Sequence, residues 1–263
     1  MVDNQLNLNL EVKHDASLSD FAGPGWLAII DAVRQLHVSL IHQLYIFGSP
    51  DTGKSHLLSA ICESFIDMGQ TAINLSLSDL LYTDVQVLSS LESFDLIAID
   101  DVDAIVGHEQ WQEALFHLIN RSHEGQRRLL FAADRPTNQL FFSLRDLKTR
   151  LAQAPSFKVP DGHNLADRKA MLESILRRRG WQFHADITGY LLAEGPHNTG
   201  AMLRVLSHLQ PMFANMPRVN ISKSSITEAM KIIDEQTLLA ELEDIHEQTQ
   251  QEAIQNQNFI LDY

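Results

Sequence analysis

The sequence has little cysteine, few positive charges and no long apolar run, and each shortage excludes a class of protein. Its one cysteine, Cys62, cannot build a disulfide framework, which favours a reducing compartment. No apolar run approaches the roughly 18 residues of a membrane span, and the N-terminus lacks a basic segment followed by an apolar core. We therefore predict a cytoplasmic protein without a membrane partner.

The formal net charge of −14 is concentrated toward the C-terminal end. Residues 234–263 contain eight acidic side chains and neither Lys nor Arg. Clustered Lys and Arg are what neutralises DNA phosphates, so this charge argues against direct, sequence-specific DNA binding. The acidic, Gln-rich tail over 237–263 is expected to solvate the protein or repel nucleic acid.

Short apolar runs alternate with helical patterns along the middle of the chain. After a flexible arm over 1–14, residues 15–160 give this alternation, which predicts an α/β domain with a parallel sheet. The expected strands are 43–47, 71–75, 94–99, 128–132 and 157–159, and the expected helices are 26–38, 54–68, 109–123 and 144–151. Only helical patterns follow Pro160, so a small all-helical lid is expected over 161–236.

A phosphate-binding loop follows the first expected strand. The stretch matches Gly-x-x-x-x-Gly-Lys-Ser in full, and a helical pattern begins at its end. The glycines let the backbone wrap a phosphate, and the helix N-terminus points N–H groups at the anion. The candidate nucleotide-binding residues are Gly48, Ser49, Pro50, Asp51, Thr52, Gly53, Lys54, Ser55 and His56.

Two carboxylates end the third expected strand. Asp100 and the Ser55 hydroxyl are the candidate ligands of Mg²⁺, and Asp101 is the candidate residue that orients an attacking water. The alternative is that these acids only begin the next loop or cap a helix. The phosphate loop about fifty residues upstream favours the functional interpretation.

Two further candidates depend more on context. Asp134 follows the fourth strand, where ligands of open parallel sheets bind, so it can face a γ-phosphate; a simple strand-to-turn junction closed by Pro136 is the alternative. Arg145 and Arg150 lie in the helix that follows. An arginine there can enter a neighbouring active site, although on the residues alone a solvated surface arginine is the better interpretation.

The order of these motifs resembles the AAA+ superfamily over about residues 15–236. Three details are similar to the bacterial replication initiator DnaA and its relatives: the Asp pair at 100–101, the segment 132–136 with Asp134, and the segment 146–150 ending in Arg150. No basic helix-turn-helix pattern follows the lid, and 79–93 is too short for the helical insertion of initiators. The chain therefore resembles the regulatory inactivators of the initiator, the Hda family.

That resemblance implies a function and partners. Arg150 would act as a trans arginine finger on ATP bound to the DnaA initiator, which would inhibit re-initiation of DNA replication. The arm would bind the DNA polymerase sliding clamp as an extended peptide through Gln5, Leu6, Leu8 and Leu10, although Asn9 stands where such peptides usually carry proline. The implied cofactors are ADP or ATP with Mg²⁺, the implied location is near the nucleoid and replisome, and a homo-oligomer is an open alternative.

One departure from the family affects the lid. Gly200 stands where the family carries a phosphate-contacting arginine, and Arg204, one turn later, is the candidate substitute. Weak intrinsic hydrolysis is therefore expected. The alternatives are a self-assembling ATPase, which the intact Lys54 and Ser55 favour, and a helicase loader of related fold.

Overall fold

The computed structural model describes residues 16–213 and 221–235, and it divides into two compact units. The first contains the chain up to Gly180 together with His197–Gly200, and the second contains Trp181–Pro196 and the chain that follows Gly200. Helix α6 therefore belongs to the first unit, which also contains the phosphate loop.

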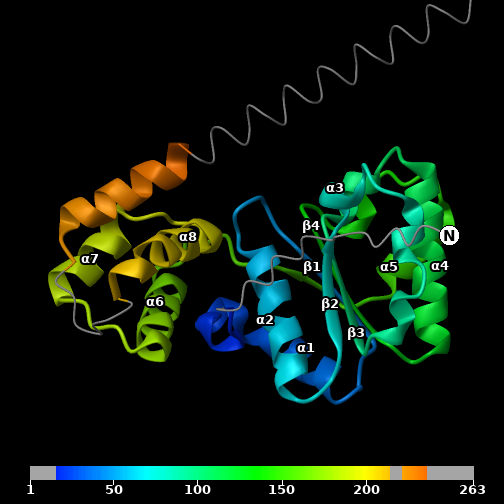
Figure 1. The fold of residues 1–263 in the computed structure, drawn as a ribbon, viewed down its shortest axis with the longest axis horizontal. Coiled ribbons are helices and arrows are strands. Elements are labelled where there is room, and N and C mark those ends of the chain that lie inside the picture. The colour runs from blue at the N-terminus through cyan, green and yellow to red at the C-terminus, as the bar shows by residue number, and fades with distance from the viewer. Residues whose placement is uncertain (1–15, 214–220, 236–263) are drawn as a thin grey trace, which may run out of the picture. The chain divides into compact units, whose positions relative to one another are not determined.

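A five-stranded parallel sheet forms the centre of the first unit (Figure 1), in the order β2-β3-β4-β1-β5. The strands are β1 (Gln43–Phe47), β2 (Ala72–Ser76), β3 (Leu96–Asp100), β4 (Arg128–Ala133) and β5 (Ser156–Lys158). β1 and β3 lie on either side of β4, so the two motif-bearing strands end at the same edge of the sheet. The predicted α/β fold with a parallel sheet is confirmed.

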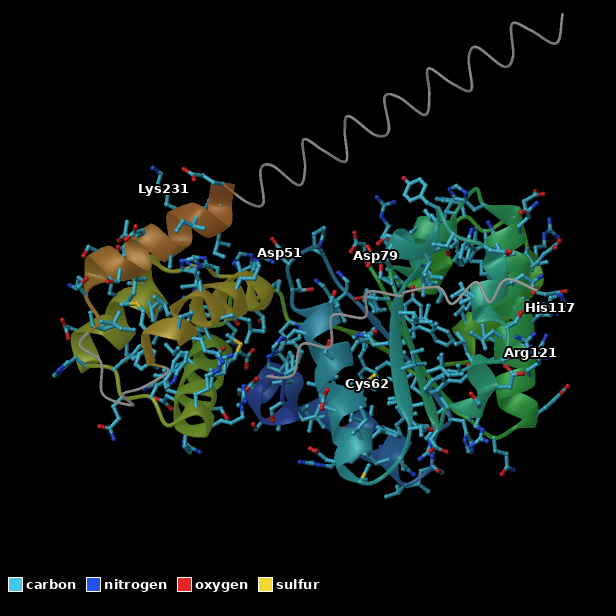
Figure 2. The ribbon with its side chains drawn as sticks, in the orientation of Figure 1. Asp51, Cys62, Asp79, His117, Arg121 and Lys231 are labelled. Atoms are coloured by element: carbon cyan, nitrogen blue, oxygen red, sulfur yellow. The ribbon has the colours of Figure 1, made fainter. Side chains whose placement is uncertain are left out.

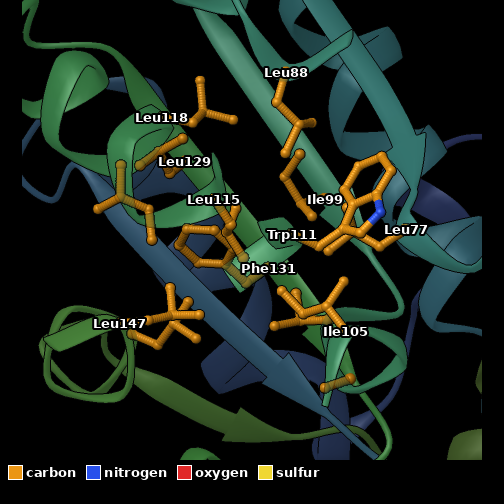
Figure 3. Packing of buried hydrophobic residues seen from close by; sticks show 14 of the residues in the cluster. Leu77, Leu88, Ile99, Ile105, Trp111, Leu115, Leu118, Leu129, Phe131 and Leu147 are labelled. Atoms are coloured by element: carbon orange, nitrogen blue, oxygen red, sulfur yellow. The ribbon is translucent and has the colours of Figure 1, made fainter. Parts of the chain in front are cut away.

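The helices cover both faces of this sheet. The helices of the first unit are α1 (Leu27–His37), α2 (Lys54–Asp67), α3 (Leu77–Leu80), α4 (Glu109–Glu124), α5 (Arg145–Ala152) and α6 (Leu165–Arg179). Side chains of β3 alternate between the two faces: Leu96 and Ala98 pack with α1 and α2, whereas Ile97 and Ile99 pack with α3, α4 and α5. Figure 3 shows the second of these clusters, built around Phe131, Leu115 and Leu147. Burial on both faces explains why β3 and β4 are continuous apolar runs.

Helix α6 has sequence signals at both ends. The Asn164 side chain accepts a hydrogen bond from the Ala166 amide at the start, and Gly180 adopts the left-handed conformation at the end, with φ 68°. Gly180 is also the last residue of the first unit before Trp181.

Helices joined by short loops make up the described part of the second unit. It contains α7 (Ala185–Glu194), most of α8 (Thr199–Leu209) and a helix over 223–235. Trp181, Phe183 and Phe213 stack here, with ring centroids of Trp181 and Phe213 4.2 Å apart. None of the helices within 16–213 and 221–235 is both long and apolar enough to cross a membrane.

Candidate nucleotide-binding site

The phosphate loop is a sharp turn between β1 and α2. Asp51 and Gly53 both have positive φ, 63° and 91°, which brings the chain back onto the end of β1; Figure 2 labels Asp51 in this loop. The Gly48 amide donates to the carbonyl of Ala133 at the end of β4, and the Thr52 hydroxyl donates to the carbonyl of Ser49. The first amides of α2 have no acceptor one turn earlier in the helix, so they are placed to bind an anion.

Lys54 is almost buried and extends across this loop. Its ammonium donates to the carbonyls of Gly48 (2.8 Å) and Ser49 (3.2 Å) and to a carboxylate oxygen of Asp134 (2.8 Å). An ammonium has three N–H donors, so all three have acceptors within the first unit. The lysine is thus fixed beside the turn in which the sequence analysis places a phosphate.

The candidate lid residue Gly200 approaches the same loop. Its amide donates to the Asp51 carbonyl at 2.8 Å. A Cβ atom added at this glycine would fall 2.6 Å from that carbonyl oxygen and 3.3 Å from the Gly53 nitrogen. The close approach of two backbones therefore excludes a side chain at position 200. Arg204 lies in the second unit, and its role stays a prediction.

Two oxygen-bearing side chains lie together at the carboxyl end of β3, where the sequence predicts a Mg²⁺ site. Asp100 is 3% exposed at the end of β3, and its carboxylate accepts hydrogen bonds from the Ser55 hydroxyl and from the Asp101 amide. Burial first, and then the neighbouring Asp101 charge, raises the pKa of Asp100 to about 6. The Ser55 hydroxyl and the Asp100 carboxylate are both oxygen donors, the kind of ligand that Mg²⁺ prefers. Ser55 and Asp100 therefore fit this ion.

The Asp101 side chain binds a different set of residues from its chain neighbour Asp100. Asp101 adopts the left-handed conformation, φ 54° and ψ 44°, and its Oδ2 accepts hydrogen bonds from the hydroxyls of Ser76 (2.7 Å) and Ser78 (2.9 Å). Although it precedes the short helix Val102–Ile105, its side chain makes no capping hydrogen bond to that helix. The carboxylate that sequence reasoning assigned to an attacking water is thus bound by two serines.

Asp134 is held from two sides. Its amide donates to Asp103 Oδ1 at 3.0 Å, and its carboxylate pairs with Lys54. The Tyr45 hydroxyl donates to the carbonyl of Arg135 at 2.8 Å, which fixes the turn that follows β4. Burial raises the pKa of this tyrosine, so the hydroxyl remains a donor. Asp134 lies next to the phosphate loop, as the carboxyl-end rule for strands predicts.

The two arginine candidates are on α5. Arg150, in the last turn, is half-buried, and Arg145, at the start, is exposed. Among the residues that the structure describes, neither guanidinium makes a hydrogen bond or an ion pair. By contrast, the nearby Lys148 is committed to the carbonyls of Asn138 and Leu140.

His56, in the first turn of α2, joins a buried ion pair. Its ring lies 3.5 Å from Asp20, which is fully buried and accepts two hydrogen bonds from Arg178 on α6, at 2.7 and 2.9 Å. Burial alone would raise the pKa of Asp20, but hydrogen bonds from His56 and Arg178 and their charges hold it below its usual value. This cluster connects the short helix Leu18–Asp20 to α6 and to α2, the helix that follows the phosphate loop.

The sequence does not predict several residues that hold the candidate site residues in place. Ser76, Ser78 and Asp103 hold the carboxyl-end acids, and Asp20 pairs with Arg178 over 158 residues of chain. Ser76 ends β2, next to β3 in the sheet, so the rule that identified Asp134 could have found it. The clamp-binding candidates Gln5, Leu6, Leu8 and Leu10 lie outside the described residues.

The strand order, the loop after β1 and the acid pair after β3 define a P-loop protein of the α/β class. Known proteins refine this class. Residues 28–155 match the family of bacterial DnaA ATPase domains. An uncharacterized protein of Haemophilus influenzae is 30% identical over 195 residues, which cover 73% of this chain and 83% of that protein.

Two solved structures share the fold. AMPPCP-bound DnaA from Aquifex aeolicus superposes with a TM-score of 0.62 at 22% identity, covering 76% of this chain and 66% of the Aquifex chain. Domain III of the Thermotoga maritima initiation protein DnaA gives a TM-score of 0.63 at 19% identity, covering 83% of this chain and 97% of that domain. The chain belongs to the DnaA-related family of AAA+ proteins.

Proposed function

We propose that this chain is a regulatory nucleotide-binding adaptor that supplies Arg150 to ATP bound by a second AAA+ protein, the DnaA initiator. The observation that carries the proposal is the contrast within α5. Lys148 is committed to backbone carbonyls, whereas the Arg150 guanidinium, at the end of the helix, makes no hydrogen bond or ion pair to any residue that the structure describes. A half-exposed arginine with unused donors is suited to a ligand in another protein.

The chemistry of phosphoryl transfer supports this use of an arginine. Negative charge develops on the transferred γ-phosphoryl group and on the leaving oxygen, and a guanidinium brought to that charge accelerates hydrolysis by about 10³ to 10⁵. Arg150 would donate to the γ-phosphate oxygens of initiator-bound ATP and stabilise them during attack by water. The initiator would be left with ADP, which would inhibit re-initiation of replication.

The chain's own site would hold ADP or ATP. The Aquifex relative of the same fold is bound to AMPPCP, and the loop, Lys54 and the Ser55–Asp100 pair described above offer the same kinds of donor. When Mg²⁺ is present, it would supply charge neutralisation at the outer phosphates through Ser55 and Asp100. In this proposal the bound nucleotide is mainly structural and intrinsic hydrolysis is weak.

The N-terminal arm would bring the adaptor to its place of action. Gln5, Leu6, Leu8 and Leu10 would bind the sliding clamp on DNA as an extended peptide. Binding to the clamp raises the local concentration of the adaptor near newly replicated DNA, without any new contact to the initiator. This step would link inactivation of the initiator to ongoing replication.

The test measures hydrolysis of radiolabelled ATP pre-bound to purified bacterial initiator, with clamp loaded on DNA and this protein in the ADP form. The native chain should stimulate hydrolysis strongly, and Arg150→Ala should lower the stimulation by at least about 10³-fold. Gln5→Ala should lower the stimulation in reactions whose stimulation depends on the DNA-loaded clamp, and it should have no effect on any stimulation that occurs without the clamp. Arg145→Ala, on the same helix, is the matched control and should retain most of the stimulation.

Stimulation that survives Arg150→Ala unchanged would overturn the proposal. A second candidate, a self-assembling ATPase that uses Arg150 on its own neighbour, is favoured by the complete set of Lys54, Ser55, Asp100 and Asp101. It predicts rapid ATP turnover by the isolated chain that rises with protein concentration and requires Arg150.

A further inference from the structure

Gln112 is a fully buried polar side chain of α4 that binds two other parts of the first unit. Its Nε2 donates to the carbonyl of Ile105 at 2.9 Å, at the end of the short helix that follows the acid pair. Its Oε1 accepts hydrogen bonds from the Ser143 hydroxyl at 3.0 Å and from the Leu144 amide at 3.1 Å, just before α5. Both lone pairs of this oxygen are therefore used. A buried amide costs free energy unless it is hydrogen-bonded, and these bonds offset that cost.

The start of α5 is held by Gln112 and not by a cap in its own sequence. Leu144 occupies the position before the helix, where Ser, Thr, Asp or Asn usually accepts a hydrogen bond from the first turn. An apolar side chain cannot accept such a bond, and the Leu144 side chain makes none. Gln112 binds the Leu144 amide and the adjacent Ser143 hydroxyl from the neighbouring helix. The beginning of α5 is thus tied to α4.

Apolar packing alone would fix α5 less closely. Leu147 and Leu151 bury the inner face of α5 in the cluster that contains Leu115 of α4; Figure 3 labels Leu147 and Leu115. The hydrophobic effect is non-directional, so such a face tolerates small shifts of the helix. Hydrogen bonds require a donor–acceptor distance of about 3 Å and a nearly linear arrangement. The bonds from Gln112 therefore define where the helix begins.

The position of the helix start determines the position of Arg150. Arg150 lies six residues after Leu144 in the same helix, or about 9 Å along the axis at about 1.5 Å per residue. Over so short a length a displacement of the helix start is carried to the arginine. A misplacement of about 1 Å can lower the rate of a catalysed reaction by about 10²-fold.

We propose that Gln112 is a positioning residue for Arg150. Through the Leu144 amide and the Ser143 hydroxyl, it holds α5 where the guanidinium reaches ATP bound by the second AAA+ protein. Because Gln112 is fully buried, it acts on that ATP only through α5. The inference rests on the proposed function, since it concerns the same arginine, and it predicts that a change at Gln112 lowers the rate of stimulated hydrolysis without weakening the encounter with the initiator.

The first test measures single-turnover hydrolysis of initiator-bound ATP over a range of concentrations of this chain in the ADP form. Gln112→Met keeps a side chain of similar length and removes all three hydrogen bonds. The maximal rate should fall by about tenfold or more, whereas the chain concentration that gives half of the maximal rate should stay within about twofold. Gln112→Glu keeps the acceptor for Ser143 and Leu144, so it should retain more of the maximal rate than Gln112→Met. Gln110→Met, at an exposed position of the same helix, is the matched control and should behave as the native chain.

Hydrogen exchange of the isolated chain separates positioning from general stability. Gln112→Met should speed exchange of the α5 amides by about tenfold or more and leave the amides of α2 unchanged, as a local opening would. If Gln112 only stabilised the fold, exchange would rise throughout the first unit. The loss of stimulation would then follow the folded fraction and disappear at a temperature at which the variant is fully folded.

The outcomes are distinguishable. An unchanged maximal rate, or an increase in exchange that is uniform over the first unit, would refute the role of Gln112. Ser143→Ala removes one of the two bonds to this segment at an exposed position, and it should lower the maximal rate by a smaller factor. If Gln112→Met does not fold, an unchanged rate in Ser143→Ala decides against the inference. A loss in Arg150→Ala without one in Gln112→Met defeats this inference alone, whereas no loss in Arg150→Ala defeats the proposed function and this inference with it.

Discussion

The amide of Gly200 donates a hydrogen bond to the carbonyl of Asp51, so two backbone segments 149 residues apart meet at the phosphate loop with no side chain between them. A Cβ atom at position 200 would fall within 2.6 Å of the Asp51 oxygen. A backbone carbonyl cannot relieve such a clash by changing rotamer, as a flexible side chain can. The glycine at the position of the family's arginine is therefore a requirement of the packing in this protein.

We expect Gly200→Ala to displace the phosphate loop. Nucleotide affinity should fall by on the order of tenfold, or about 1.4 kcal/mol, although alanine is the better helix former by about 1 kcal/mol. Gly200→Arg begins from the same Cβ atom, so it should weaken binding as well. Titration with a fluorescent ADP analogue measures the affinity.

Gly189→Ala is the matched control for this prediction. Gly189 is also helical, in α7, and a Cβ atom there would meet nothing within 4 Å. This variant should be neutral or stabilising. Affinity in Gly200→Ala equal to that of the native chain would show that the loop accommodates a side chain without cost.

The pair Asp20–Arg178 should contribute strongly to stability. Asp20 is fully buried, and Arg178→Met would leave its charge without the bidentate partner, at a cost of about 3 to 5 kcal/mol at pH 7.5. His56 would remain at 3.5 Å as a weaker partner. Urea unfolding gives the free energy, and Arg177→Met, an exposed neighbour on α6, should change it by at most about 0.5 kcal/mol.

The stability lost in Arg178→Met should depend on pH in a predictable direction. In the native chain the lowered pKa of Asp20 stabilises the fold above the unfolded value, near 3.8, and this contribution is lost as the pH falls through the folded value. Without Arg178, burial would raise the pKa of Asp20 instead. The deficit of Arg178→Met should therefore be smaller at pH 4.5 than at pH 7.5, and a deficit that does not vary between these pH values would contradict the assignment.

Most strands of the first unit and its phosphate loop could be predicted from short sequence patterns. Continuous apolar runs of four to six residues predict strands buried on both faces, and β1, β3 and β4 are such runs. The phosphate loop could be predicted because its glycines and its lysine lie close together in one short segment of the sequence. The Ser55–Asp100 pair could be predicted because Asp100 ends β3 and Ser55 lies at the start of α2, and both positions are at the same edge of the sheet.

Contacts between distant segments could not be predicted in the same way. The short-range pattern around Asp101 is equally compatible with a cap, a water-orienting acid and a carboxylate held by serines. Only the pairing of β2 with β3 brings Ser76 to it. Likewise, nothing in the segment around Asp20 indicates Arg178, because a buried ion pair leaves no periodic signal in either partner's sequence.

Asp100 should reduce the stability of the nucleotide-free protein near neutral pH. Its pKa is raised from 3.8 to about 6 by burial and by Asp101. Between these values the folded state holds a proton that the unfolded state has released, so the free energy of unfolding falls as the pH rises through this window. A shift of about two units corresponds to about 3 kcal/mol at most. Asp100→Asn should therefore stabilise the protein by about 1 to 3 kcal/mol at pH 7.5.

The effect should be much smaller at pH 4.5, where Asp100 is protonated in the folded native chain. Urea unfolding in EDTA at both pH values measures it, and Asp79→Asn, an exposed carboxylate on α3, should show no such pH-dependent gain. The same substitution removes the carboxylate that would hold Mg²⁺, so added Mg²⁺ should no longer strengthen nucleotide binding. An Asp100→Asn protein that is less stable than the native chain at pH 7.5 would mean that the hydrogen bonds from Ser55 and Asp101 outweigh the cost of burying the charge.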